Sequence, residues 1–124
     1  MRNLLQTIFY NKKISNLDVD GKDLTIEHNS ILRKKKLLRS AYETFYKEMS
    51  VNCDKYFKID GLEIELGSGV GFFKSIRQNI KTSDIREGFN YDMSLDATDM
   101  QIDNDTVKCF FAINVFHHIS QPTK

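Results

Sequence analysis

The chain has 124 residues, of which 40% are hydrophobic and 28% charged, and its formal net charge is +1. This length predicts one small domain with a buried core, and the balanced charge gives no indication of a nucleic-acid or membrane partner. No apolar run approaches the roughly 20 residues of a membrane-spanning helix, and the amino terminus becomes polar too early for a signal peptide. Because Cys53 and Cys109 are far apart in the sequence, we expect free thiols and a cytoplasmic location.

The first part of the chain is predicted to be mainly helical. Apolar residues over 4–9 predict a short amphipathic helix, the acidic and glycine residues of 18–21 predict a turn, and residues 24–26 predict a brief strand. Asn29 and Ser30 then offer an N-cap for a longer helix.

That longer helix is predicted over residues 31–49, where apolar side chains recur at helical spacing. Its other face carries a basic cluster at residues 33–36 and at Arg39. We favour a solvated helix face over nucleic-acid binding, because binding would also need a platform on which bases stack. We expect residues 1–58 to form a helical extension or lid and residues 59–124 to form the core of one domain.

The most informative segment is residues 62–73. Apolar residues alternate with glutamates over 62–66, which predicts a strand, and three of the chain's six glycines follow at Gly67, Gly69 and Gly71. Apolar residues near helical spacing then predict a helix over 72–79. Glycines at alternate positions let the backbone turn sharply and approach a ligand closely, so the segment predicts a loop that binds a nucleotide-type cofactor.

Two features distinguish between cofactors. A dinucleotide fingerprint, G-x-G-x-x-G, requires a glycine where Phe72 stands, which disfavours a nicotinamide dinucleotide. Glu65, at the end of the strand, would repel a pyrophosphate and attract an ammonium group. The string E-L-G-S-G-V-G resembles the first motif of class I S-adenosylmethionine-dependent methyltransferases. The resemblance implies that Ser68 and the three glycines wrap the cofactor and that Glu65 lies near its amino group.

A second carboxylate follows at a suitable distance. Residues 80–85 predict a second strand, and Asp84 lies 17 positions after Gly67. In nucleotide-binding βαβ units a carboxylate about 20 residues after the loop reaches the ribose hydroxyls, so Asp84 is predicted to bind a ribose. The alternative is an exposed aspartate at the end of a strand.

Residues 91–100 predict a third, short strand that ends at Asp96 and Ala97. In the methyltransferase family a D-A pair at this place meets the adenine, through the carboxylate and the following backbone amide. The resemblance therefore implies that Asp96 and Ala97 bind the base, with Asp99 as an alternative to Asp96.

The most hydrophobic run, residues 109–116, predicts a strand buried on both faces. Its end is similar to the fourth motif of the family, which implies that Asn114 contacts the methionine part of the cofactor or orients the substrate. His117 and His118 are weak candidates for a general base, with a structural role as the alternative. We expect no metal site, because neighbouring helical side chains diverge and His28 is the only other histidine.

Together these elements predict an α/β fold with a Rossmann-like, mostly parallel sheet, comprising about four of the seven strands of a methyltransferase sheet. The fourth strand would be an exposed edge, so we expect a truncated domain, the front part of a larger enzyme, or a homodimer that covers the edge. The resemblance implies methyl transfer from S-adenosylmethionine to a small-molecule or glycan-type acceptor. A non-catalytic cofactor-binding or dimerising fragment and a dinucleotide-dependent oxidoreductase remain as alternatives.

Overall fold

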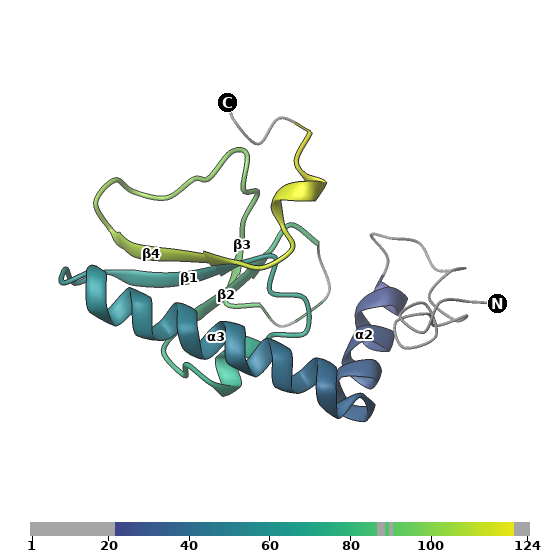
Figure 1. Cartoon of the computed structure of the whole chain (residues 1–124). Helices are drawn as coiled ribbons and strands as arrows, with labels where there is room; N and C mark the ends of the chain where they lie inside the picture. Colours follow the sequence, from purple (N-terminus) through teal and green to yellow (C-terminus); the bar gives the residue numbers. More distant parts are fainter. Residues whose placement is uncertain (1–21, 87–88, 90, 121–124) are drawn as a thin grey trace.

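The computed structural model describes residues 22–86, 89 and 91–120 (Figure 1). The predicted helix at 4–9 and the predicted turn at 18–21 lie outside the described residues. The elements in chain order are α2 (Lys22–Lys34), α3 (Lys36–Tyr56), β1 (Leu62–Leu66), the 3-10 turn η2 (Phe72–Ser75), β2 (Lys81–Asp84), β3 (Met93–Ser94), β4 (Val107–Ala112) and the 3-10 turn η3 (Phe116–His118). No helix within these ranges is long and apolar enough to cross a bilayer.

The helical region differs from the prediction at its start. Residues 24–26 belong to α2 and not to a strand, and Asn29 and Ser30 lie inside that helix and do not cap it. A three-residue β-branched preference is too weak to specify a strand that does not join the sheet. The predicted helix 31–49 is broken at Lys35, whose φ of −94° and ψ of 88° leave the helical region, and α3 then continues to Tyr56.

The four strands form one parallel sheet in the order β3-β2-β1-β4. The chain adds β2 and β3 on one side of β1 and then returns to add β4 on the other side. The strand order therefore reverses between β1 and β4, which is the place where open α/β sheets bind ligands. This is the predicted α/β, Rossmann-like architecture, and the fold class is confirmed.

One face of the sheet is covered by α3, which lies along it (Figure 1). Tyr42, Tyr46, Met49 and Cys53 form a stripe on the helix because their spacings of four, three and four residues place them on one side. They pack in a cluster with buried side chains of η2, β4 and the residue before β2, namely Phe73, Phe111 and Ile80. The Phe73 ring stacks on Tyr46 at a centroid distance of 4.2 Å.

The opposite face has a second core around Ile64, Leu66 and Leu95. Ile64 and Leu66 of β1 enter this core, whereas Glu65 between them faces α3, where it bonds Tyr46, as the pleat of a strand requires. β4 forms one edge of the sheet, and its Phe110 is 41% exposed.

The second half of the chain contains less regular structure than its pattern predicts. The helix expected over 72–79 is only the single turn η2, the third strand is only Met93–Ser94, and the fourth strand lies slightly earlier than residues 109–116. After η2, Arg77 is held by charged partners, because its Nη2 donates to Glu63 Oε1 at 2.7 Å and to Asp54 Oδ1 at 2.7 Å. These contacts fix the connection to β2 in place of further helical turns.

Candidate functional site

The glycine loop leaves the carboxyl end of β1 at the point where the strand order reverses. Gly67, Gly69 and Gly71 have φ angles of 61°, 54° and 67°, in the left-handed region that L side chains rarely adopt. The sequence prediction of a sharply turning backbone at alternate glycines is therefore confirmed.

The surroundings of the three glycines differ. A Cβ on Gly67 would lie 2.8 Å from Val115 Cγ2, so the glycine allows the segment after β4 to pack on the loop. A Cβ on Gly71 would lie 3.8 Å from Thr82 Cγ2, an ordinary contact. A Cβ on Gly69 would meet no atom within 4 Å. Gly67 is thus explained by packing, whereas Gly69 faces open space.

Ser68 joins the loop to β2. Its backbone amide donates to Ser83 O at 2.8 Å, its hydroxyl donates to Glu65 O at 3.1 Å, and that hydroxyl accepts from Ser83 N at 3.0 Å. The Ser68 side chain is buried and fully engaged in holding the two strands together. Its carbonyl accepts from Gly71 N at 2.8 Å, so the backbone of Ser68 is engaged as well, and a role in binding the cofactor stays a prediction.

Glu65 is the most unusual group in the site. It is 2% exposed, and Tyr46 Oη of α3 donates to its Oε1 at 2.7 Å. Its second oxygen, Oε2, is buried and has no hydrogen-bond partner among the described residues. Burial raises the pKa of Glu65 to about 7, against the opposing hydrogen bonds of Tyr46 and Ser68 and with further repulsion from Asp84.

Asp84 ends β2 beside the glycine loop, as predicted, but its carboxylate is already engaged. Arg86 Nε donates to Oδ1 at 3.0 Å and Arg86 Nη2 donates to Oδ2 at 2.8 Å, while the Gly69 amide donates to Oδ2 at 3.3 Å. Burial alone would raise the pKa of Asp84, but the hydrogen bonds and charge of Arg86 outweigh it and lower that pKa. A ribose diol would have to displace this guanidinium.

Tyr91 fixes the loop from the far side, because its hydroxyl donates to Gly69 O at 2.9 Å. Gly69 is thus held through its amide by Asp84 and through its carbonyl by Tyr91. Neither Tyr91 nor Arg86 is predicted as a site residue from the sequence, and Tyr46, where the alternatives are a cofactor contact and a core aromatic, lies in the core. The only signal available was the position of Arg86, two residues after a strand-ending acid.

Asp96 and Ala97 lie near the same edge but do not enter the cluster around Gly69. Ser94 pairs with Asp84 in the sheet, so the two residues follow the tip of β3 closely. The Asp96 carboxylate accepts from Thr98 N at 2.8 Å and from Thr98 Oγ1 at 2.6 Å, which makes a local turn. Ala97 packs on the core of Ile64 and Leu66. A role in binding a base stays a prediction.

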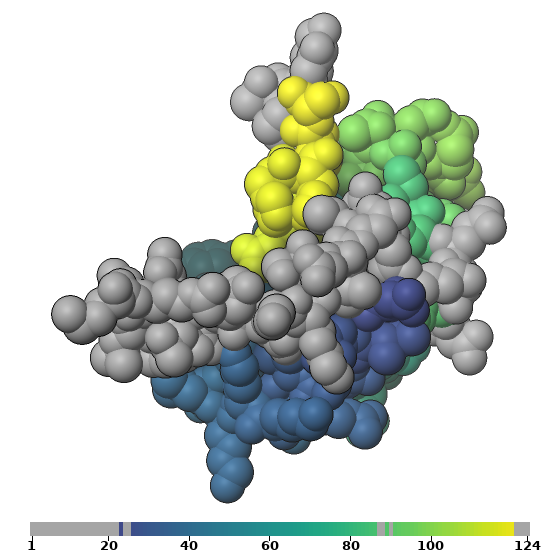
Figure 2. Space-filling model, turned by 90° about the vertical axis from the view of Figure 1, so that its right-hand side faces the viewer, coloured from purple at the N-terminus to yellow at the C-terminus, as the bar shows by residue number. Residues whose placement is uncertain are grey.

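Asn114 follows β4 with a φ of 57°, and its Nδ2 donates to Tyr42 Oη of α3 at 3.3 Å. The adjacent His117 and His118 are exposed in η3. Their ring centroids are 3.9 Å apart, so the expectation that the side chains diverge is wrong. In Figure 2 this segment, in yellow, stands clear of the blue surface of the helices.

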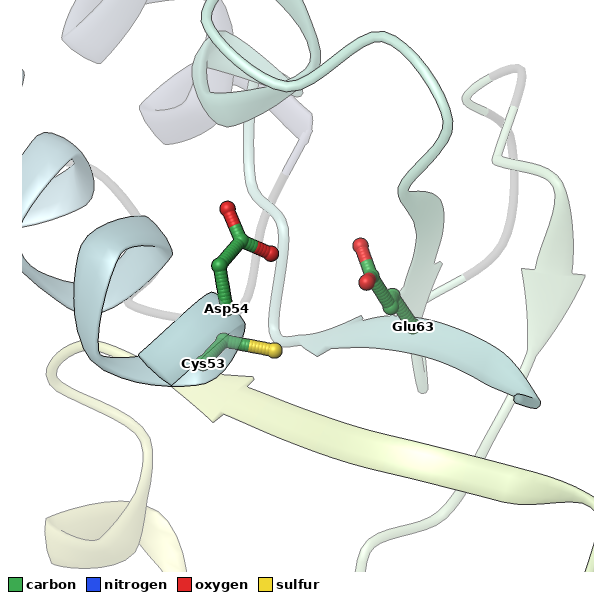
Figure 3. A group of neighbouring side chains, drawn as sticks. All are labelled: Cys53, Asp54 and Glu63. Carbon is green, nitrogen blue, oxygen red and sulfur yellow. The ribbon is translucent and has the colours of Figure 1, made fainter. Parts of the chain in front are cut away.

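A separate group lies at the opposite, amino-terminal edge of the sheet. Cys53, Asp54 and Glu63 place one ligand atom each within 4.8 Å of one another (Figure 3). The two carboxylates already face cations, because Arg77 bonds both of them and Lys108 Nζ donates to Glu63 Oε1 at 2.9 Å. Hydrogen bonds from Arg77 lower the pKa of Glu63 to about 2. We therefore interpret this group as an ion-pair network that ties α3 to the sheet.

A hollow of about 410 Å³ opens beside that network and is lined by Gly61, Leu62, Glu63, Arg77, Gln78 and Asn79. It lies at the other end of the strands from the glycine loop, so it is distinct from the candidate site. No model of a known protein family matches the chain, and no curated protein or solved structure matches it. The functional argument accordingly depends on the geometry of the glycine loop.

Proposed function

We propose that the chain binds S-adenosylmethionine over the loop of residues 67–71 and transfers its methyl group to a small-molecule or glycan-type acceptor. The observation that carries the proposal is the environment of Gly69. Its backbone is held in the left-handed region by Asp84 and Tyr91, and its Cα faces open space at the place where the strand order reverses. A backbone fixed in this way allows a ligand to approach closely.

The charges near the loop support a cofactor that is cationic at one end and carries hydroxyl groups at the other. Glu65 has a carboxylate oxygen with unused acceptor capacity, which suits an ammonium group, but that oxygen is buried, so the surrounding side chains would have to move to admit one. Asp84 would accept from the ribose once Arg86 has moved. Asp96 with the backbone of Ala97 would hold the adenine, and Asn114 would contact the methionine part, as the sequence resemblance implies.

The bound cofactor would supply a methyl group that its positive sulfur already activates, so the chain needs to contribute mainly alignment. Asn114 and Tyr42, which are hydrogen-bonded to each other, lie at the end of β4 where an acceptor could be oriented. The exposed His117 or His118 would take a proton from an acceptor hydroxyl or amine. The class of acceptor rests on the resemblance and on the small net charge of the chain.

Titration calorimetry with S-adenosylhomocysteine and, separately, with NAD tests the cofactor. We expect heat of binding with the first and none with the second. Binding of NAD alone would favour the oxidoreductase alternative, and binding of neither would contradict the proposal. Transfer of labelled methyl groups to an extract of small molecules then separates an enzyme from a protein that only binds the cofactor.

Gly69→Ala is predicted to weaken S-adenosylhomocysteine binding by about tenfold or more, because the new Cβ would occupy the ligand's space. Gly71→Ala is the matched control. It imposes a similar left-handed strain of about 1–2 kcal/mol, but its Cβ points at Thr82 and away from the open space. Calorimetry on both variants should show a large loss of affinity only for Gly69→Ala. Equal losses would indicate that strain and not ligand contact is responsible.

Asp84 and Arg86 give a second pair of variants with opposite predictions. Asp84→Asn should weaken cofactor binding by about 1–3 kcal/mol through loss of charge-assisted hydrogen bonds. Arg86→Gln should strengthen it, because the guanidinium that now holds both Asp84 oxygens would no longer compete with the ribose. Weaker binding by both variants, measured by calorimetry, would contradict the ribose assignment and would assign the two residues a joint structural role.

The edge strand β4 favours a second candidate role, in which the chain binds the cofactor and associates with a second copy. The strand is six residues long and has a neighbour, β1, on one side within the described sheet. An unpaired edge with an exposed Phe110 favours pairing with another strand. Analytical ultracentrifugation is expected to show a dimer that Phe110→Lys weakens, and a monomer at all concentrations would rule this role out.

A further inference from the structure

The fold brings the two cysteines of the chain near each other, and both are free thiols, as the sequence predicts. Cys53 lies near the end of α3 and Cys109 lies in β4. The neighbouring side chains meet as well, with Asp54 Oδ1 4.0 Å from Lys108 Nζ. Cys109 is the register partner of Glu63, and the Cys53 Sγ lies within 4.8 Å of a Glu63 carboxylate oxygen.

Two further observations place the thiols in the same part of the core. Both cysteines belong to the core on the α3 face of the sheet, where Cys109 packs against the cluster that contains Cys53. The Cys53 thiol is also near enough to help raise the pKa of Cys109. Figure 3 shows Cys53 projecting from α3 toward the sheet, with Glu63 on the neighbouring β1. Two cysteines that project into one core from a helix and the strand it packs on are placed where a bridge could form.

We infer that Cys53 and Cys109 are a thiol pair that a low-molecular-weight disulfide oxidises to an intramolecular disulfide, which fastens α3 to the edge strand β4. Cys53 is 2% exposed and Cys109 is partly exposed, so Cys109 reacts first. Its thiolate attacks the small disulfide and releases one small thiol, leaving a mixed disulfide on Cys109. The Cys53 thiolate then attacks the Cys109 sulfur and releases the second small thiol. The two protein thiols thereby lose two electrons and two protons to the oxidant.

The surroundings of the pair set the speed of the reaction. Burial, the Cys53 thiol and the nearby Glu63 charge raise the pKa of Cys109 to about 11. Only the thiolate attacks. As long as the pH is below that pKa, each increase of one pH unit should therefore raise the rate of disulfide formation about tenfold. The pair is therefore slow to oxidise at neutral pH and much faster in alkaline solution.

The bridge would act on the helix stripe that supports the candidate site. Cys53 lies on the same side of α3 as Tyr46, which donates to Glu65, and Tyr42, which accepts from Asn114. Fastening Cys53 to β4 holds this stripe on the sheet. The unfolded chain also loses freedom when two distant residues are joined, so the oxidised form should resist unfolding.

The test uses the whole chain treated with oxidised glutathione at pH 7 and at pH 9. We expect a monomer whose mass is lower by two hydrogen atoms, no thiol that iodoacetamide can label after denaturation, a much faster reaction at pH 9, and a urea midpoint that moves to higher concentration. Because the chain has two cysteines, this mass identifies the bridge without further mapping. A stable glutathione adduct, a disulfide-linked dimer, or two unreacted thiols at pH 9 would overturn the inference.

Single variants provide the control. Cys53→Ala should accumulate a stable glutathione adduct on Cys109, because no second thiol remains to displace it. Cys109→Ala should leave the buried Cys53 unreacted in the folded chain. A third arm repeats the oxidation with zinc and with a chelator. Thiols that oxidise only after chelation would assign the pair to a metal ion and overturn the disulfide. The unsubstituted chain decides the question even if a variant does not fold.

Discussion

Replacing Glu65 with glutamine is expected to change the pH dependence of stability strongly. Between pH 4.5 and pH 8, the free energy of unfolding of Glu65→Gln should rise by about 3 kcal/mol relative to that of the unsubstituted chain. The stability of Glu65→Gln relative to the unsubstituted chain should therefore be highest in mildly alkaline solution.

The sign follows from the raised pKa. Burial lifts the pKa of Glu65 from 4.5 in the unfolded chain to about 7 in the fold, so the folded state binds more protons between these values. The contribution of Glu65 to the free energy of unfolding is fully present below about pH 4.5. It is lost as the pH rises toward 7, because a charge must then form on a buried group. Glutamine carries no charge at any pH and does not have this loss.

Urea unfolding of both chains at several pH values measures the difference. Glu63→Gln is the matched control, because Glu63 lies two residues away on the same strand and its pKa is lowered to about 2 by Arg77 and Lys108. Its contribution is present above about pH 4.5 and is lost as the pH falls toward 2, the reverse of Glu65. If the difference in free energy of unfolding between Glu65→Gln and the unsubstituted chain does not change with pH, Glu65 is not buried as described.

Gly61→Ala is expected to be the most destabilising glycine substitution, at about 3 kcal/mol or more. Gly61 has a φ of 153°, and a Cβ there would lie 2.8 Å from Lys108 N and 2.9 Å from Thr106 O. These are backbone atoms of the segment that pairs with β1, and Leu62 N donates to the same Thr106 O at 2.8 Å. The β1–β4 pairing must therefore shift to admit the methyl group.

Gly69→Ala is the comparison for this experiment as well, because its Cβ meets no atom within 4 Å and only the backbone strain of about 1–2 kcal/mol remains. Chemical unfolding of both variants should separate the two costs. A similar stability for Gly61→Ala and Gly69→Ala would mean that the start of β4 can move aside without cost.

The strands and their parallel arrangement were predictable because each depends on a local pattern. Alternation over residues 62–66, the glycines after it and the apolar run ending near residue 116 specify β1, its turn and β4. The predictions of a strand over 24–26 and of a helix over 72–79 were wrong for a different reason. Their patterns are short, and the structure they adopt depends on contacts made elsewhere, such as the ion pairs of Arg77.

In the candidate site, the sequence predicted where the residues lie in the chain better than it predicted which side chains bond them. The three positive-φ glycines, Glu65 and Asp84 all stand where a motif predicts them. That Tyr46 bonds Glu65, or that Arg86 holds Asp84, could not be predicted, because those contacts depend on side-chain packing across the fold. The presence of Cys53 and Cys109 in one core depends in the same way on how α3 packs on the sheet.

The reversal of strand order also has a consequence for biosynthesis. Ile64 pairs with Lys81, 17 positions away, and with Phe110, 46 positions away. Closing the longer loop costs more chain entropy, so β1 and β2 should associate first, while the segment that becomes β4 is still being translated. The most apolar stretch of the nascent polypeptide is therefore the last to find its neighbour, and it is the segment that a ribosome-bound chaperone would meet exposed.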